Sequence, residues 1–212
     1  MTDVLDELAA ARREVGKGPL PAGEGDTVVL RRRYDAEVED VWDAITTPER
    51  LSRWFLPVTG DLRVDGTYQL EGNAAGEILQ CQPPRMLRVS WLYGEEAQRG
   101  TSEVEVLLAP SPLGGTDIVL THTAIVDPEF LAEYGPGATG VGWDLGLMGL
   151  ALHLAGEQVA DPSEFEASAE AREFSRRSAA AWGEAHLASG ADPEQAAAGV
   201  EATTNFYAPE PA

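Results

Sequence analysis

Few residues of this chain have the type and spacing needed for acid–base chemistry. His122 lies in the segment TDIVLTHTAI, where it shares a period-two face with Ile118 and Leu120. If this face points inward, the imidazole is either a structural side chain or a proton donor or acceptor for a bound carbonyl group. Glu77 could form a dyad with His122, but the sequence does not fix the face on which Glu77 lies. No serine or cysteine with an assigned base accompanies His122, so we name no catalytic residue.

Metal-binding and nucleophilic residue types are scarce. Cys81 is the only cysteine and lies in a predicted strand, which excludes an internal disulfide and a cysteine zinc cluster. The histidines His122, His153 and His186 are far apart in the sequence and form no metal-binding spacing such as HxxxH. The glycine pairs are typical of turns and lack the spacing of a nucleotide-binding loop. We therefore predict neither a metal nor a cofactor.

Aromatic side chains recur on the faces that are predicted to be buried. Tyr68, Trp91 and Tyr93 lie on period-two faces of strand candidates, and Trp143 lies on the apolar stripe of a predicted helix. Ordinary core packing is one interpretation, because large apolar side chains are mostly inside. The other is the wall of a ligand site, where tyrosine and tryptophan pack against an apolar ligand and offer a hydrogen-bonding group. The candidate ligand-binding residues are Trp54, Phe55, Tyr68, Trp91, Tyr93, His122, Trp143 and Leu147.

These residues must be positioned by a strand-rich body that is followed by helices. Residues 27–35 predict a strand, and the segments VEDVWDAIT and PERLSRWF predict two short helices. From residue 56 to residue 125, short apolar alternations separated by turn signals predict an antiparallel meander with one buried face. Residues 141–160 predict a long apolar helix. The Asp-Pro pairs at 161–162 and 192–193 each predict the start of a further helix.

The N-terminal segment has a different pattern. Val4, Leu8, Ala11 and Val15 recur at helical spacing and predict a short amphipathic helix over residues 3–15. The segment GKGPLPAGEGD that follows is rich in glycine and proline and predicts a linker. The chain then divides into an N-terminal helix and linker (1–26), a main domain (27–160) and a C-terminal helical extension (161–212).

Charge limits the classes of partner. The 212 residues include 36 acidic and 15 basic side chains, with a net charge of −21, and no Lys or Arg lies between Arg99 and Arg172. Such a balance argues against a nucleic acid or an anionic membrane as partner. The run 136–156 approaches the length of a membrane span, but Asp144, His153 and several glycines argue against that interpretation. The acidic start MTDVLDEL lacks an apolar signal core, so we expect a cytoplasmic protein.

The order of strand, two short helices, meander and long helix resembles the helix-grip fold of the START/SRPBCC superfamily. YDAEVEDVWDAITTPERLSRWF resembles the opening signature of the activator-of-heat-shock-90-ATPase-like family. DGTYQLEG, GEILQCQPPRMLRVSW, GGTDIVLTHTAI and GWDLGLMGLALHL are similar to its later strands and to the start of its grip helix. The resemblance covers about residues 27–156. It implies an α+β helix-grip fold, in which a curved antiparallel sheet wraps round a long C-terminal helix, here with extra N- and C-terminal helices.

The resemblance also implies a cavity between sheet and helix, which we expect to measure about 300–1,000 Å³. The superfamily includes lipid carriers, hormone receptors, cyclases, oxygenase subunits and co-chaperones, so the fold does not settle the function. We expect a protein that binds a small hydrophobic ligand. The alternatives are a cyclase- or hydrolase-like enzyme that uses His122 and a cavity tyrosine, or a co-chaperone-like protein. If the protein forms a homodimer, we expect the terminal helices to mediate it.

Overall fold

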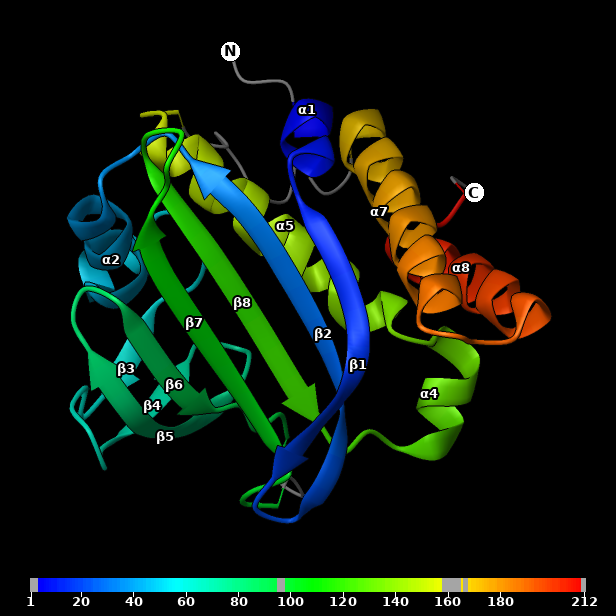
Figure 1. The fold of residues 1–212 in the computed structure, drawn as a ribbon, viewed down its shortest axis with the longest axis horizontal. Coiled ribbons are helices and arrows are strands. Elements are labelled where there is room, and N and C mark those ends of the chain that lie inside the picture. The colour runs from blue at the N-terminus through cyan, green and yellow to red at the C-terminus, as the bar shows by residue number, and fades with distance from the viewer. Residues whose placement is uncertain (1–3, 95–97, 158–164, 166–167, 211–212) are drawn as a thin grey trace.

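A computed structural model describes residues 4–94, 98–157, 165 and 168–210. Within them, eight strands form a curved antiparallel sheet in the order β1-β2-β8-β7-β6-β5-β4-β3 (Figure 1). Successive strands are neighbours except where β2 pairs with β8, which confirms the predicted meander. The strands are β1 (Arg12–Leu20), β2 (Gly23–Tyr34), β3 (Val58–Gly60), β4 (Thr67–Leu70), β5 (Ala75–Gln82), β6 (Met86–Ser90), β7 (Ser102–Pro110) and β8 (Thr116–Ala124).

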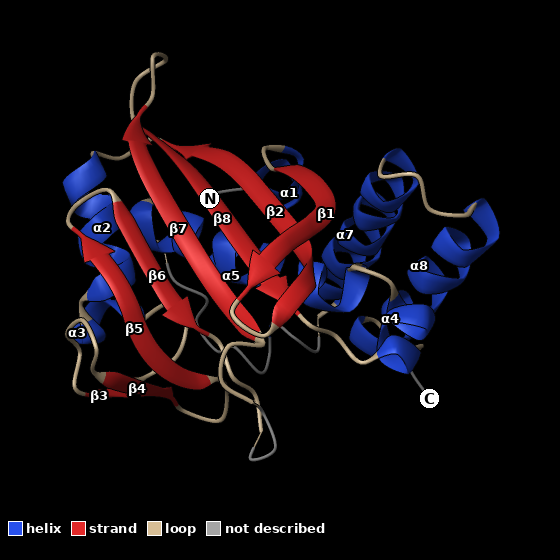
Figure 2. Ribbon diagram, turned by 60° about the horizontal axis from the view of Figure 1, so that its bottom comes forward, coloured by secondary structure: helices blue, strands red, loops and turns tan. Residues whose placement is uncertain are grey.

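One helix covers a face of the sheet, and the other helices form two groups that flank it. Helix α5 crosses the sheet face, while α4, α7 and α8 gather beside β1 and β2 (Figure 2). Helices α2 and α3 lie at the opposite side, near β7 and β3. The bounds are α1 (Val4–Ala9), α2 (Val38–Thr46), α3 (Pro48–Leu51), α4 (Pro128–Tyr134), α5 (Gly137–Leu154), α7 (Ala169–Ala188) and α8 (Pro193–Tyr207). This arrangement is the predicted helix-grip fold.

The core lies between α5 and the sheet. Leu30 of β2 and Leu120 of β8 are register partners, and both are buried. They belong to the same apolar cluster as Val141 and Leu150 of α5, which are fully buried. Burying one such side chain contributes roughly 1.5–3 kcal/mol. The period-two strand pattern and the apolar helix therefore meet as the sequence predicts.

The N-terminal segment differs from the prediction. The helix predicted over residues 3–15 ends at Ala9, and the predicted linker is mostly a β-hairpin formed by β1 and β2. Strand β1 lies at the edge of the sheet, where glycine and Pro19 are tolerated because part of the strand needs no hydrogen-bond partner. Val15, which shares the helical spacing of Leu8 in the sequence, instead pairs with Val28 of β2. The sheet therefore begins before residue 27.

The C-terminal elements agree in part with the prediction. The helix predicted over 141–160 begins earlier and ends sooner, as α5. The start of α8 is confirmed, because the Asp192 side chain accepts hydrogen bonds from the backbone N–H groups of Glu194 and Gln195. The helix start predicted at 161–164 lies outside the described residues, and α7 begins after a Ser168 cap. In the described ranges, no helix combines the length and the apolar character needed to span a membrane.

Candidate functional site

A cavity of about 350 Å³ lies between α5 and the sheet, with residues of α2 and α3 at one side. We call it the central cavity. Its volume falls in the range that the sequence analysis predicts, and its wall is almost entirely apolar. The strands contribute apolar side chains that alternate along the sequence, as the period-two pattern predicts, and Trp91 directly follows β6; these residues are Tyr68, Leu70, Leu87, Val89, Trp91, Val106 and Leu120. Arg63 is the charged residue among the described lining residues, and its guanidinium group is paired with Asp61 at 2.8 Å.

A second cavity, of about 550 Å³, lies where β6 and β8 end and β7 begins. It is also lined by residues of α4, α5 and α8. Aromatic rings dominate this wall, together with uncharged polar side chains such as Asn73, Ser102 and Thr139. Phe206 and Tyr207 of α8 take part, so the C-terminal extension forms one side of this second cavity.

The rings of Phe55, Trp91 and Trp143 line both cavities and separate them. The Phe55 and Trp143 rings are stacked, with centroids 6.4 Å apart. The Trp91 and Trp143 centroids are 5.0 Å apart, and those of Phe55 and Trp91 are 6.4 Å apart. These distances are typical of interacting aromatic pairs. We refer to these three rings as the aromatic partition.

A chain of hydrogen bonds runs from the aromatic partition into the second cavity. The Trp143 indole donates through Nε1 to His122 Nδ1 at 3.0 Å, and His122 Nε2 lies 2.9 Å from Ser102 Oγ. An indole N–H can only donate, so Nδ1 is the acceptor. The neutral imidazole then carries its proton on Nε2 and donates it to Ser102 Oγ.

This geometry limits the chemistry of His122. Burial lowers the pKa of its imidazole from 6.5 to about 4, so the ring is neutral near pH 7. Its Nδ1 lone pair is occupied and its Nε2 already holds a proton. In this arrangement His122 cannot take the hydroxyl proton of Ser102, and the pair does not form an activated nucleophile. Glu77 does not form a dyad with His122, because both ring nitrogens have other partners and the Glu77 carboxylate pairs with Arg99 at 2.8 Å.

Two tyrosine hydroxyls near the cavities, those of Tyr68 and Tyr207, are directed at backbone carbonyls. Tyr68 Oη donates to the Ser90 carbonyl at 2.7 Å, and Tyr207 Oη donates to the Ala138 carbonyl at 2.7 Å. Burial raises the pKa of both phenols, so both stay protonated near neutral pH. The described residues include no group of three or more His, Cys, Asp or Glu side chains able to hold a metal ion.

The structure divides the predicted ligand-binding residues between the two cavities. Those that line the central cavity are Trp54, Phe55, Tyr68, Trp91, Trp143 and Leu147. His122 also lies between the sheet and α5, but it lines the second cavity and not the central one. Tyr93 also lies at the second cavity, but it is 71% exposed because β6 ends at Ser90 and the period-two face does not continue to it.

Ser102 is the site residue that the sequence reasoning missed. It opens β7 two positions before Val104, which is the register partner of His122. Ser102 is therefore the diagonal neighbour of His122 on the same face of the sheet. The alternation Ser102, Val104, Val106 carried this signal, but the prediction began the strand's buried face at its first apolar residue. The aromatic residues of α4 and α8 had no comparable signal, because their place depends on tertiary packing.

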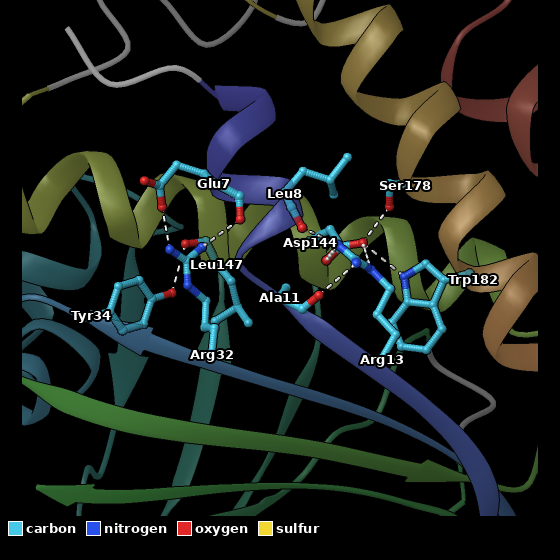
Figure 3. Close-up of polar contacts among 10 residues, drawn as sticks. All are labelled: Glu7, Leu8, Ala11, Arg13, Arg32, Tyr34, Asp144, Leu147, Ser178 and Trp182. Atoms are coloured by element: carbon cyan, nitrogen blue, oxygen red, sulfur yellow. Dashed lines mark hydrogen bonds and ion pairs between the residues drawn. The ribbon is translucent and has the colours of Figure 1, made fainter. Parts of the chain in front are cut away.

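The opposite side of α5 holds a buried polar cluster (Figure 3). Asp144 accepts two hydrogen bonds from Arg13 of β1, at 2.9 and 2.8 Å. It also accepts from Ser178 Oγ and, at 3.0 Å, from Trp182 Nε1, both on α7. Arg13 also donates to the Ala11 carbonyl. We call this group, Arg13, Asp144, Ser178 and Trp182, the buried polar cluster. It joins β1 and α7, which come from the two ends of the chain, to α5.

Comparison with known proteins identifies relatives of this chain. The family model described as activator of Hsp90 ATPase homolog 1-like protein matches residues 35–155. Comparison with functionally curated proteins gives no match.

Several solved structures are similar to this chain. CalU16 from Micromonospora echinospora is 37% identical. Its crystal structure covers 81% of this chain and 98% of CalU16 with a TM-score of 0.62, and its solution structure covers 85% and 97% with a TM-score of 0.69. An HSP90 activator from Plasmodium falciparum is 20% identical, covers 61% of this chain and 96% of its own, and has a TM-score of 0.53, so it shares the fold.

Proposed function

We propose that this chain, which belongs to the family of activator of Hsp90 ATPase homolog 1-like proteins, binds a small and mainly apolar molecule in the central cavity. Members of this family bind small hydrophobic ligands. The observation that carries the proposal is the apolar wall of a cavity of about 350 Å³. Each CH₂ group transferred from water into such a site contributes about 0.8 kcal/mol.

The position of the cavity supports this proposal. A helix packed flush on a sheet leaves few voids larger than a water molecule. Here Gly146 of α5 lines the cavity, and a Cβ atom built on it would come no nearer than 3.6 Å to the Phe55 ring. Glycine at this point of the helix keeps the space open. It also weakens the helix by roughly 0.5–1 kcal/mol relative to alanine.

The experiment is a fluorescence titration with N-phenyl-1-naphthylamine, an uncharged aromatic probe whose emission rises in apolar surroundings. We expect saturable binding to the full chain. Gly146→Leu should fill the central cavity and abolish the signal. Gly142→Leu is the matched control, one turn earlier on the same helix, where the new side chain would enter the second cavity instead.

Cooperative thermal unfolding of both variants would establish that they are folded. Failure of the probe to bind, or equal binding by the original chain and the folded Gly146→Leu variant, would contradict the proposal. Native mass spectrometry of freshly purified protein provides an independent measurement. We expect it to reveal a co-purified molecule of low mass that Gly146→Leu does not retain.

A further inference from the structure

We propose that the second cavity binds an uncharged, oxygen-bearing part of the same ligand whose apolar part fills the central cavity. This inference rests on the proposed function and specifies the class of ligand. The site is then bipartite, with the aromatic partition in contact with both parts of the molecule. Three features of the second cavity carry the inference: its contact with the central cavity at shared residues, the absence of charged side chains among the described residues that line it, and a directed hydrogen-bond donor.

The two cavities adjoin at shared residues. Phe55, Trp91 and Trp143 belong to both walls, so a molecule seated in either cavity contacts the same three rings. Trp143 and Trp91 are half-buried although they lie in the middle of the domain, because there is space on both sides of them. In the proposed complex, a ligand that extends from one cavity into the other displaces these rings from the positions described above.

The described part of the wall of the second cavity carries no charge. Among the described residues that line it, there is no Asp, Glu, Lys or Arg, and His122 is neutral. An ionised ligand group would lose hydration there without gaining a partner. An uncharged group with oxygen atoms is matched by the hydroxyls and amide of the wall.

Ser102 supplies a directed donor. Its Oγ accepts the proton of His122 Nε2, so its own hydroxyl hydrogen is available to an acceptor in the cavity. The same chain of hydrogen bonds begins at Trp143 in the aromatic partition. A ligand oxygen that accepts from Ser102 is therefore placed next to the partition, at the point where the two parts of the ligand join.

The rim of the second cavity adds apolar contact surface. Phe206 is 63% exposed and Phe130 is 42% exposed, and both line the cavity together with Ile125. The rings of Phe206, Tyr134 and Tyr207 contact one another, with centroid distances of 5.9 and 4.9 Å. Exposed aromatic side chains grouped around a cavity are typical of binding sites. Such rings can pack on the apolar faces of an oxygenated ring without requiring charge.

The test compares three competitors with the same alkyl chain. Octyl glucoside, octyl sulfate and octyltrimethylammonium, all below their micellar concentrations, are used to displace N-phenyl-1-naphthylamine from the full chain. We expect the uncharged glucoside to displace the probe at the lowest concentration. The negative protein would attract the ammonium compound non-specifically, so a preference for the glucoside over it cannot come from net charge.

Two variants assign this preference to the second cavity. Gly142→Leu should keep probe binding and lose the preference for the glucoside. Ser102→Ala, which removes one oxygen atom, should weaken displacement by the glucoside about 3- to 10-fold, the effect of losing one hydrogen bond. It should leave displacement by octyl sulfate unchanged. Ser102→Ala decides the test if Gly142→Leu does not fold.

The outcomes separate the two proposals. If the probe does not bind, or Gly146→Leu does not affect it, the proposed function fails. If the probe binds as expected but the glucoside is no better than the ammonium compound, the bipartite site is wrong while the central cavity stands. The bipartite site is also wrong if the Ser102→Ala variant and a folded Gly142→Leu variant still prefer the glucoside to the charged competitors.

Discussion

Trp143 and Asp144 are adjacent on α5 and face opposite environments. Trp143 lies in the aromatic partition, half-buried, with a cavity on each side of its ring. Asp144 lies in the buried polar cluster, where both carboxylate oxygens accept hydrogen bonds from Arg13 and Oδ2 also accepts from Ser178 and Trp182 of α7 (Figure 3). Successive helix residues point about 100° apart, so one helix separates a tightly packed side from an open one.

The contrast between the two sides of α5 shows how the fold can be stable and still leave space for a ligand. The packed side joins β1, α5 and α7 through buried groups that satisfy one another. The open side can then leave space and expose aromatic rings without loosening the helix. If this division is right, substitutions on the two sides of α5 should have different effects.

The largest effect is expected for Asp144→Ala. Removing the carboxylate leaves the Arg13 guanidinium buried without its partner, which typically costs about 3–5 kcal/mol. Chemical denaturation monitored by circular dichroism would measure the loss in the free energy of unfolding. The double variant Arg13→Met, Asp144→Leu should recover much of it, because an apolar pair replaces the ion pair. A loss below about 1 kcal/mol for the single variant would show that Arg13 finds water there.

The next effect depends on pH and on His122. Its pKa is lowered to about 4 in the folded protein by burial, from 6.5 in the unfolded chain. Between these values the unfolded state binds a proton that the folded state does not, so stability should fall as the pH drops from 6.5 to 4, by up to about 3 kcal/mol. Free energies of unfolding at several pH values would measure this. His122→Asn should reduce the slope, and parallel curves would contradict the assignment.

The same glycine-to-alanine change, made separately at two positions of α5, tests the difference between its packed side and its open side. A Cβ atom on Gly140 would lie 2.2 Å from the Trp182 ring, whereas on Gly146 it would lie 3.6 Å from Phe55. We expect Gly140→Ala to destabilise the protein by about 1–3 kcal/mol through overpacking. Gly146→Ala should be neutral or stabilising by up to about 1 kcal/mol, because alanine favours the helix. Thermal unfolding measures both, and similar effects at the two sites would break the comparison.

The smallest effect is expected for Trp143→Phe. The ring is retained, but the indole N–H that donates to His122 Nδ1 is lost. The free energy of unfolding should fall by about 1 kcal/mol. The pKa of His122 should rise toward its ordinary value, because Nδ1 becomes able to accept a proton. Nuclear magnetic resonance titration of the imidazole measures this change, and an unchanged pKa would show that burial alone sets it.

Much of the domain could be predicted because its patterns are local. The period-two segments around Tyr68, Val106 and Leu120 became strands with these residues facing the cavity. The β1–β2 hairpin was missed because glycine, proline and charged residues conceal an edge strand, whose outer face needs no apolar side chain. Its stabilising contacts include cross-strand ion pairs such as Arg31 with Glu14, at 3.0 Å. Such pairs leave no periodic signal.

The site could be predicted only in part, for a similar reason. Period two placed Trp91 and His122 on one face, but it could not reveal that the aromatic partition divides the space between them. It could not show that Phe206 and Tyr207, far along the chain, complete the second cavity. Asp144 was noted only as evidence against a membrane span, because its partners Arg13 and Ser178 are brought to it by the tertiary fold.

The ion pair between Arg13 and Asp144 joins positions 131 residues apart, which has a kinetic consequence. The β1–β2 hairpin is a short-range contact that can close early, whereas Arg13 meets its partner only after α5 has docked. We expect the pair to form after the rate-limiting step of folding. Asp144→Ala should then accelerate unfolding and leave the folding rate nearly unchanged. The ion pair would then slow unfolding without affecting folding, and so would set the lifetime of the native state.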